Sequence, residues 1–406
     1  MKKNKHILVI SQYFFPENFR INDICKQWVS KGYKVTVVTG IPNYPQGKFF
    51  KGYGFFKKRN EVYEGINIIR LPIIARGNSS IRLVLNYLSF VISGGIWSLF
   101  SKVKPTHVFI FEVSPMTQAL PGVWFAQRKN IPCLLYVQDL WPENVEIVTG
   151  IKNPLIIQSI GKMVDYIYKH STKILTTSNS FINAIENRGV PRDKIQFWPQ
   201  YAEDFYQEIS NKSDNKIAEK LSIIFTGNIG TAQGLEILPL VAAKLKDMNL
   251  PKKIVFTLVG DGRYKSELKK LIINQKVEEY FTFIDRQPAE QIPMILSKHD
   301  IALLTLANDK LFSMTIPAKL QSYMACGMPI IGSVNGESAK IIEESEAGMS
   351  SSSGDIEGFV HNIHSFANLS KQDLNEMSIS SKKYYQKHFH KDMLLDQMDR
   401  ELEKTI

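Results

Sequence analysis

Blocks of apolar residues alternate with mixed polar segments along the chain, in the order expected of strands and helices that follow one another. Short apolar runs predict buried strands, and segments with apolar residues three and four positions apart predict helices. In the first half the expected strands are 7–11, 35–39, 108–111, 133–137, 174–177 and 195–198. The first two flank a helical pattern at 21–32. This is a βαβ unit, which predicts a parallel sheet with ligands at its carboxyl edge.

The alternation restarts in the second half, after a polar stretch without periodicity at 199–215. The expected strands there are 221–226, 254–259, 281–284, 301–306 and 329–332. A chain of 406 residues is long for a single hydrophobic core. We therefore expect two α/β domains, at 1–199 and 200–386. Residues 372–403 have the pattern of an amphipathic helix, and its last part, about 387–406, is expected to pack back on the first domain.

The stretch 312–344 predicts a helix, a buried strand and a second helix. Pro317 suits the start of the first helix, Gly327 its end, and Gly336 the start of the second. The first helix begins in a loop, with Lys319 in its first turn. Its free N–H groups and the positive end of its dipole then suit a phosphate. The alternative is an ordinary helix with a solvated Lys319.

Two glycine-rich turns follow strands of the second domain, at 227–234 and 260–263. Missing side chains at such turns let a diphosphate approach the backbone. Together with the helix start they predict a nucleotide site at the carboxyl edge of the second sheet. The sequence has no GxGxxG or Walker pattern, so neither an NAD site nor a P-loop is indicated.

Acidic residues follow three strands of the first domain: Glu17, Glu112 and Asp139. They fall on the side of the sheet where chemistry is expected. Any one of them could instead be a helix cap.

The positive charge of the chain is concentrated in the first domain. Residues 1–205 contain 26 Lys and Arg against 13 Asp and Glu, whereas residues 206–406 contain 24 against 26. A one-sided basic domain indicates an anionic partner surface, either nucleic acid or membrane. We favour the membrane, because no nucleic-acid-binding signature accompanies the charge. The three scattered cysteines are typical of a reducing cytoplasm, and we expect no signal peptide.

Residues 81–100 are the most apolar stretch of the protein and are long enough to span a bilayer. Arg82, Asn86 and the glycines at 94 and 95 argue against a lipid-exposed span. We expect a buried or half-buried helix. An interfacial membrane helix and a transmembrane span are the alternatives.

Five ordered motifs give the chain a resemblance to a known family. These are FFPENFR at 14–20, QDLWPE at 138–143, GNIGTAQG at 227–234, LVGDG at 258–262 and PAKLQSYMACGMPIIG at 317–332. The chain resembles a retaining glycosyltransferase of family 4, and within it bacterial enzymes that add N-acetyl-L-fucosamine or related sugars during O-antigen or capsule assembly. The resemblance implies the GT-B architecture, which has two Rossmann-like domains with a cleft between them.

The resemblance also implies the partners. The donor is expected to be a UDP-sugar, bound by the second domain without a metal and with no other cofactor. The acceptor is expected to be a saccharide linked to undecaprenyl diphosphate, which approaches the basic first domain. The enzyme would then be cytoplasmic and peripheral on the anionic inner face of the cell membrane, with no nucleic-acid partner.

The cations that the family uses on the donor diphosphate are missing. The family usually has Arg after the first glycine of the first turn and Lys five residues later, where this chain has Asn228 and Gln233. Lys319 is the best-placed replacement, followed by Arg263 and Arg286.

Other family positions also differ. Met314 and Ser322 stand where two glutamates usually contact the donor sugar and the ribose, and Gln138 stands where a His is often found. Asp139 is then the prominent polar group near Gln138, and Asp139 or Glu17 is expected to orient the acceptor hydroxyl.

The resemblance and the turns together predict the site residues. Those expected to bind the nucleotide sugar are Gly227, Asn228, Gly230, Gln233, Gly260, Asp261, Gly262, Arg263, Arg286, Gln287, Met314, Thr315, Ile316, Pro317, Lys319 and Ser322. Those expected at the acceptor are Glu17, Arg20, Glu112, Gln138 and Asp139. Lys319 and fixed N–H groups would stabilise the charge that grows on the departing diphosphate.

Met314 bears on the identity of the donor sugar. A thioether accepts no useful hydrogen bond from a sugar hydroxyl but suits a methyl group. This favours a 6-deoxy sugar such as N-acetyl-fucosamine or N-acetyl-quinovosamine, unless Met314 only packs beneath the loop. Two other functions stay open, namely a nucleotide-sugar epimerase of the same architecture and a non-catalytic sugar-nucleotide-binding subunit.

Overall fold

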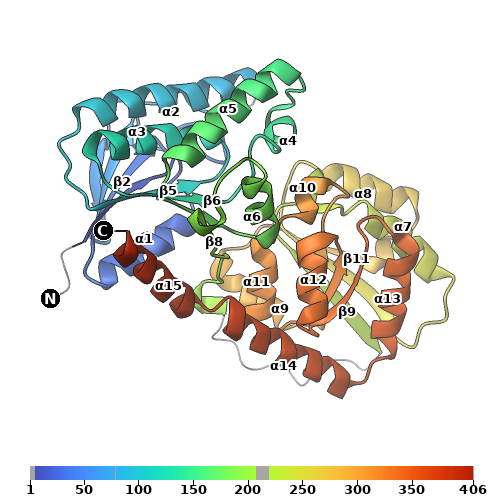
Figure 1. The fold of residues 1–406 in the computed structure, drawn as a ribbon. Coiled ribbons are helices and arrows are strands. Elements are labelled where there is room, and N and C mark those ends of the chain that lie inside the picture. The colour runs from blue at the N-terminus through green and yellow to red at the C-terminus, as the bar shows by residue number, and fades with distance from the viewer. Residues whose placement is uncertain (1–4, 78, 207–218, 406) are drawn as a thin grey trace. The chain divides into compact units, whose positions relative to one another are not determined.

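The computed structural model describes residues 5–77, 79–206 and 219–405, and the chain forms two α/β units (Figure 1). The first unit contains Met1–Trp198 with Leu395–Ile406, and the second contains Pro199–Leu394. The second unit thus continues beyond the expected end at 386. The start of the chain and residues 207–218, which include part of the polar stretch 199–215, lie outside the described residues.

The sheet of the first unit has the strand order β3-β4-β2-β1-β5-β6-β7-β8. Its strands are β1 (His6–Ile10), β2 (Lys34–Gly40), β3 (Asn60–Tyr63), β4 (Ile66–Leu71), β5 (His107–Glu112), β6 (Cys133–Val137), β7 (Lys173–Thr176) and β8 (Ile195–Phe197). Neighbouring strands are parallel except for the antiparallel pair of β3 and β4. The expected parallel sheet is confirmed.

Helices cover both faces of this sheet. They are α1 (Arg20–Ser30), α2 (Ser80–Phe100), α3 (Leu120–Lys129), α4 (Val145–Thr149), α5 (Pro154–His170) and α6 (Asn179–Glu186), with short turns η1 (Met116–Ala119) and η2 (Arg192–Lys194). Figure 1 shows α2, α3 and α5 on one face and α1 on the other. Helix α1 packs through the spacing read from the sequence, because Ile21, Ile24, Cys25 and Trp28 are its buried residues.

The sheet of the second unit is parallel throughout, in the order β11-β10-β9-β12-β13-β14. Its strands are β9 (Lys220–Thr226), β10 (Lys253–Val259), β11 (Phe281–Ile284), β12 (Ile301–Thr305), β13 (Ile330–Ser333) and β14 (Gly348–Ser351). Its helices are α7 (Ile237–Lys246), α8 (Lys265–Asn274), α9 (Ile292–Leu296), α10 (Lys310–Ser313), α11 (Ala318–Ala325), α12 (Gly336–Glu344), α13 (Ile356–Asn368) and α14 (Lys371–His388). Its short turns are η3 (Asp204–Tyr206), η4 (Thr231–Gln233), η5 (Glu278–Tyr280) and η6 (Ala289–Gln291), and α15 (Lys391–Lys404) ends the described chain.

Both sheets contain the Rossmann strand order. If the strands of the second unit are numbered from 1 to 6 along the chain, their order across the sheet is 3-2-1-4-5-6. The first unit has the same order once its edge strands β3 and β8 are left out. The order reverses between β1 and β5 in one unit and between β9 and β12 in the other. Ligands of such sheets bind outside the carboxyl ends of the strands at this reversal. The loops after β9 and β12 are therefore the first place to examine.

Three features of the fold differ from the sequence analysis. The hairpin of β3 and β4 was not expected, although Glu64 and Gly65 form its two-residue turn with positive φ at both positions, as a type I′ turn requires. Strand β14 was also not expected. The single amphipathic helix expected at 372–403 is two helices, α14 and α15, that break at Phe389.

Candidate functional site

The two glycine-rich turns of the second unit pack directly against each other. A Cβ on Gly260 would lie 1.9 Å from the carbonyl oxygen of Gly227, and one on Gly262 would lie 2.2 Å from that of Ile229. The Ile229 N–H also donates to the Asp261 carbonyl, at 2.9 Å. Any side chain at 260 or 262 would therefore collide with the neighbouring turn, so glycine is required at both positions. The reason expected from the sequence was a different one, namely the close approach of a ligand. The two turns form one continuous backbone surface.

Lys319 lies beside the first of these turns. Its Nζ donates a hydrogen bond to Oε1 of Gln233 and sits 4.0 Å from the centroid of the Phe225 ring. A Cβ placed on Gly227 would lie 3.7 Å from the same Nζ. Burial lowers the pKa of Lys319 to about 7. The structure therefore brings together the helix start, the first turn and Gln233, which are three parts of the predicted donor site.

Helix α11 is tied to the end of β9 by a buried hydroxyl. Tyr323 accepts a hydrogen bond from the N–H of Thr226 at 3.0 Å through its Oη, and its side chain has no exposed surface. Thr226 ends β9 immediately before Gly227. Pro317 caps α11 without a side-chain hydrogen bond to the first turn, and its carbonyl accepts from the Leu320 N–H at 2.8 Å, so the N–H groups of Ala318 and Lys319 are the ones that could meet another partner. Tyr323 is a positioning residue that the sequence analysis did not single out.

Four of the predicted donor residues, Asn228, Asp261, Arg263 and Arg286, are exposed on the turns at this edge of the sheet. Gln287 is half-buried, and its side chain donates to the Asp285 carbonyl at 3.0 Å.

Lys265 is a cation at this edge that the sequence analysis missed. Its Nζ donates to the Gly260 carbonyl at 3.2 Å and pairs with Asp285 at 2.7 Å. Because it opens α8 directly after the second turn, it links the turn after β10 to the turn after β11. Its place in the first turn of a helix, after a glycine-rich loop, was the available signal.

The loop before α11, and α11 itself, carry further predicted donor residues. Met314 ends α10 and is half-buried, as is Thr315, whose hydroxyl donates to the Leu311 carbonyl at 2.9 Å. Ile316 is buried. Ser322 turns its hydroxyl back to the Ala318 carbonyl at 3.2 Å, within its own helix.

The first unit places Asp139 at the carboxyl edge of its sheet, after β6. Its Oδ2 accepts a hydrogen bond from the Ser114 N–H at 2.7 Å, and Ser114 in turn accepts bonds from Trp141 and Asn144 through its hydroxyl. Burial raises the pKa of Asp139 above its usual value. The residue is half-buried, so it keeps some exposed surface.

The other two acidic residues have little or no exposed surface. Glu17 is 3% exposed, and its carboxylate accepts hydrogen bonds from the N–H groups of Phe14, Asn43 and Tyr44, which ties two loops together. Glu112 is fully buried; burial raises its pKa well above its usual value, and the nearby Asp139 carboxylate adds to the shift. An acceptor cannot reach either carboxylate in this structure. Of the three, we keep only Asp139 for contact with an acceptor.

Two further predicted acceptor residues gather around Tyr136. Gln138 is 8% exposed and hydrogen-bonds the Tyr136 side chain. Arg20 begins α1 and lies close enough to act on the same hydroxyl electrostatically. These two residues come from different loops of the sheet edge, and Tyr136 itself is buried in β6.

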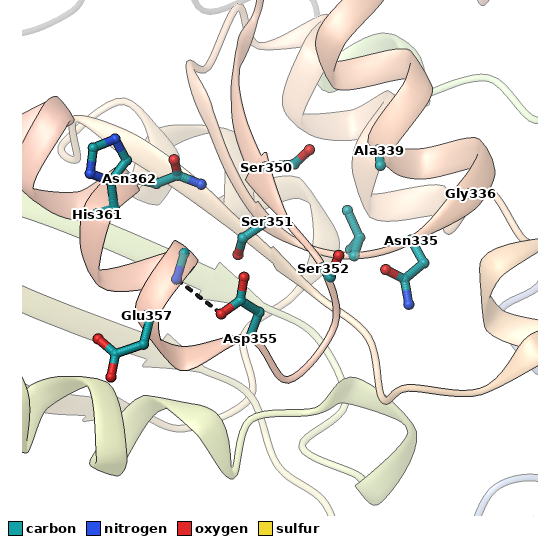
Figure 2. Close-up of a pocket in the computed structure, with 12 residues that line it drawn as sticks. Asn335, Gly336, Ala339, Ser350, Ser351, Ser352, Asp355, Glu357, His361 and Asn362 are labelled. Atoms are coloured by element: carbon teal, nitrogen blue, oxygen red, sulfur yellow. Dashed lines mark hydrogen bonds between the residues drawn. The ribbon is translucent and has the colours of Figure 1, made fainter.

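A polar pocket of about 760 Å³ lies at the ends of β13 and β14 (Figure 2). It is lined by hydroxyl and amide groups such as Ser351 and Asn362, and by the carboxylates of Asp355 and Glu357. None of the residues that the structure places around it is a Lys or Arg. Carboxylates without a cation disfavour a diphosphate, so we do not assign the donor to this pocket. Within residues 5–77, 79–206 and 219–405, no group of three or more His, Cys, Asp or Glu side chains could hold a metal ion.

Comparison with known proteins covers both units. The family model described as "Glycosyl transferase 4-like domain" matches residues 18–200, and the model "Glycosyl transferases group 1" matches residues 207–384. WcaI of Escherichia coli (strain K12), named as a colanic acid biosynthesis glycosyl transferase, is 24% identical over 319 residues, which are 74% of this chain and 75% of WcaI. AmsK of Erwinia amylovora, an amylovoran biosynthesis glycosyltransferase, is 22% identical over about half of each chain (50% and 49%).

Solved structures share the whole fold. Sucrose-phosphate synthase from Thermosynechococcus elongatus has a TM-score of 0.75 at 15% identity and covers 98% of both chains. Anabaena HepE in complex with UDP has a TM-score of 0.68 at 13% identity, over 99% of this chain and 100% of HepE. At such identities these likenesses concern the fold, and the two family models carry the assignment. The chain belongs to the group 1 glycosyltransferases with a family-4-like first domain, and its two units have the GT-B fold.

Proposed function

We propose that this glycosyltransferase moves a sugar from a UDP-sugar to a lipid-linked saccharide, with retention of configuration, during the synthesis of a surface polysaccharide. The observation that carries the proposal is the cluster of Lys319, Gln233 and the Gly227 turn beside the start of α11, where Pro317 provides no side-chain cap for the helix. Such a cluster suits a diphosphate, because it joins one cation with fixed N–H donors. The UDP named in the HepE structure, and the colanic acid and amylovoran named in the relatives, support a nucleotide-sugar donor and a polysaccharide product.

The proposed reaction exchanges one bond at the anomeric carbon. The bond from this carbon to the β-phosphate oxygen breaks, and a bond to the acceptor hydroxyl oxygen forms on the same face. The acceptor proton passes to the departing phosphate, so UDP leaves and no residue of the enzyme is consumed. Negative charge grows on the diphosphate during this step, and Lys319 with the α11 N–H groups would stabilise it.

Asp139 is the group that we propose for the acceptor. It is the one of the three predicted acidic residues that keeps exposed surface, and Ser114 holds its Oδ2 in place. The remaining carboxylate oxygen can accept a hydrogen bond from the acceptor hydroxyl and orient it. Glu17 takes no direct part in this scheme, because three backbone N–H groups occupy its carboxylate.

The donor sugar that we favour is a 6-deoxy-N-acetylhexosamine such as N-acetyl-L-fucosamine. This part rests on Met314, which stands at the end of α10 directly before the loop to α11. A hydroxyl facing its thioether would lose a hydrogen bond, which costs about 1–3 kcal/mol, whereas a methyl group would not. We further propose that the acceptor is carried on undecaprenyl diphosphate, that no metal or other cofactor takes part, and that the enzyme works at the inner face of the cell membrane.

The direct test is mass spectrometry of a lipid-linked acceptor after incubation with a panel of UDP-sugars. A gain in mass of one sugar residue, together with release of UDP only when acceptor is present, is the expected result. Formation of a free epimerised nucleotide sugar would assign the protein to the epimerases instead. UDP binding without any transfer, across the whole panel, would favour a non-catalytic subunit.

A further inference from the structure

Helix α2 presents a continuous apolar stripe to solvent. The stripe consists of Ile81, Leu85, Leu88, Ile92, Ile96 and Leu99, which recur every three or four residues along the whole helix. Ile92 is 64% exposed and Ile96 57%. At a rise of about 1.5 Å per residue the stripe is about 27 Å long. Scattered exposed apolar residues need no explanation, but an unbroken row of this length marks an interaction surface.

The opposite face of α2 is committed to the protein. Asn86 is fully buried, accepts a hydrogen bond from Gln12 at 2.7 Å and donates to the Ile74 carbonyl at 2.6 Å. Gly94 packs against Pro121 of α3, and the Trp97 ring stacks on Phe125. By length and composition α2 is the one helix in the described part of the chain that could cross a membrane. Because its inner face is polar and packed against the protein, α2 is not a free span surrounded by lipid.

The charges around the stripe favour an anionic surface. Between Glu64 and Asp139 the sequence has seven Lys and Arg and only one acidic residue, Glu112, which is fully buried. Arg82 at one end of α2 and Lys102 and Lys104 at the other are exposed. On α4, which packs beside α2, the acidic Glu146 is paired with Lys152 at 3.0 Å.

We propose that the outward face of α2 lies in the headgroup and acyl boundary of an anionic bilayer, parallel to the membrane plane, with Arg82, Lys102 and Lys104 on the lipid headgroups. An apolar stripe with cations at both ends has the chemistry of an interfacial helix. A second copy of the chain is a poorer occupant, because it would bring the same positive ends together. This inference specifies the surface for the membrane location proposed above, but it does not depend on which sugar is transferred.

The test compares vesicle binding of matched variants by flotation, without substrates. The double variant Ile92→Glu/Ile96→Glu places two charges in the stripe. Its control is Ile379→Glu on α14, where the replaced isoleucine is 59% exposed. Vesicles of phosphatidylcholine alone are compared with vesicles that also contain phosphatidylglycerol. Thermal unfolding checks that each variant is folded, and transfer to a water-soluble acceptor analogue reports catalysis separately.

We expect the wild-type protein and Ile379→Glu to float with the anionic vesicles, and Ile92→Glu/Ile96→Glu to bind at least about tenfold more weakly. Lys102→Gln/Lys104→Gln should weaken binding by up to about fivefold for each lysine, and binding should fall with added salt. Wild-type-like binding of the double isoleucine variant would overturn the proposal. So would a wild-type dimer that this variant dissociates in sedimentation, because the stripe would then join two copies. If transfer to the soluble analogue fails while vesicle binding holds, the proposed function is wrong and the membrane surface stands.

Discussion

The Nζ of Lys319 donates a hydrogen bond to Oε1 of Gln233, although 86 positions separate the two residues in the chain. The resemblance to family 4 implies a lysine at position 233, where this chain has an uncharged amide. The structure brings a lysine from the start of α11 to that amide. We infer that the positive charge expected on the first turn is supplied here by a different element. This inference leads to the first two predictions.

Removal of the Lys319 ammonium should weaken binding of UDP. A charge-assisted contact to a partly enclosed phosphate is worth about 2–4 kcal/mol, so we expect Lys319→Ala to bind UDP about 30- to 800-fold more weakly, as measured by calorimetry. The control is Lys340→Ala on α12, where the lysine side chain is 69% exposed and pairs with Glu344 on the surface. An unchanged affinity in Lys319→Ala would remove Lys319 from the site.

Binding of UDP should also depend on pH through Lys319. Burial lowers the pKa of this lysine to about 7, and only its charged form attracts the diphosphate. Affinity should therefore be greatest near and below pH 7 and fall as pH rises above it, by up to about tenfold per pH unit. The affinities should be measured only above about pH 6, because the phosphate itself takes up a proton below that pH. Lys319→Arg, whose guanidinium stays charged, should give a flat profile. A flat profile in the wild-type protein would contradict the prediction.

Glu17 should act on stability more than on catalysis. Its buried carboxylate accepts three backbone N–H bonds, and Glu17→Ala leaves those donors without an acceptor. We expect a loss of about 3 kcal/mol in the free energy of unfolding, measured with denaturant. Glu146→Ala, which removes an exposed carboxylate on α4, should change it by less than about 0.5 kcal/mol. A Glu17→Ala variant of wild-type stability that no longer transfers sugar would instead assign Glu17 to the acceptor.

Met314 should set the preference between donor sugars. We expect kcat/KM to be higher for UDP-linked 6-deoxy-N-acetyl sugars than for their 6-hydroxy counterparts. The ratio of the two values should correspond to about 1–3 kcal/mol. Met314→Glu should shift the preference towards the hydroxylated donor, because a carboxylate accepts hydrogen bonds from hydroxyl groups. A preference for the 6-hydroxy donor that stays the same in Met314→Glu would show that this side chain does not meet the sugar.

Much of the fold could be predicted from the sequence, because its central strands are short, continuous apolar runs. The strand 133–137 was predicted with the bounds that β6 has, and the helix after Pro317 ends before Gly327 as expected. Strand β14 could not be predicted, since Gly348–Ser351 has no apolar pattern. The break at Phe389 was missed because the apolar spacing continues through both α14 and α15. The periodicity of apolar residues therefore indicates which residues face a core, but not where one helix ends and the next begins.

The candidate site could be predicted only in parts. The sequence identified Lys319 as the first-turn cation, but its bond to Gln233 depends on how β9 and α11 pack together, which no local pattern encodes. Glu17 and Asp139 both follow strands, yet one is enclosed by backbone N–H groups and the other keeps exposed surface. That difference depends on loops from distant parts of the chain. The need for glycine at 260 and 262 likewise comes from the neighbouring turn.

The central claim is that a lysine at 319 or at 233 binds the same diphosphate. The most direct test is whether a lysine introduced at 233 restores the UDP affinity that is lost when Lys319 is removed. UDP affinity is measured by calorimetry for the wild-type protein, Lys319→Ala, Lys319→Ala/Gln233→Lys and Lys319→Ala/Gln372→Lys, the last of which adds a lysine on the exposed face of α14. Because Nζ of Lys319 and Oε1 of Gln233 are in contact, a lysine side chain introduced at 233 can bring its ammonium to the same place. We predict that Gln233→Lys restores the affinity of Lys319→Ala to within about tenfold of wild type and that Gln372→Lys does not. Equal, weak binding by both double variants would contradict the account.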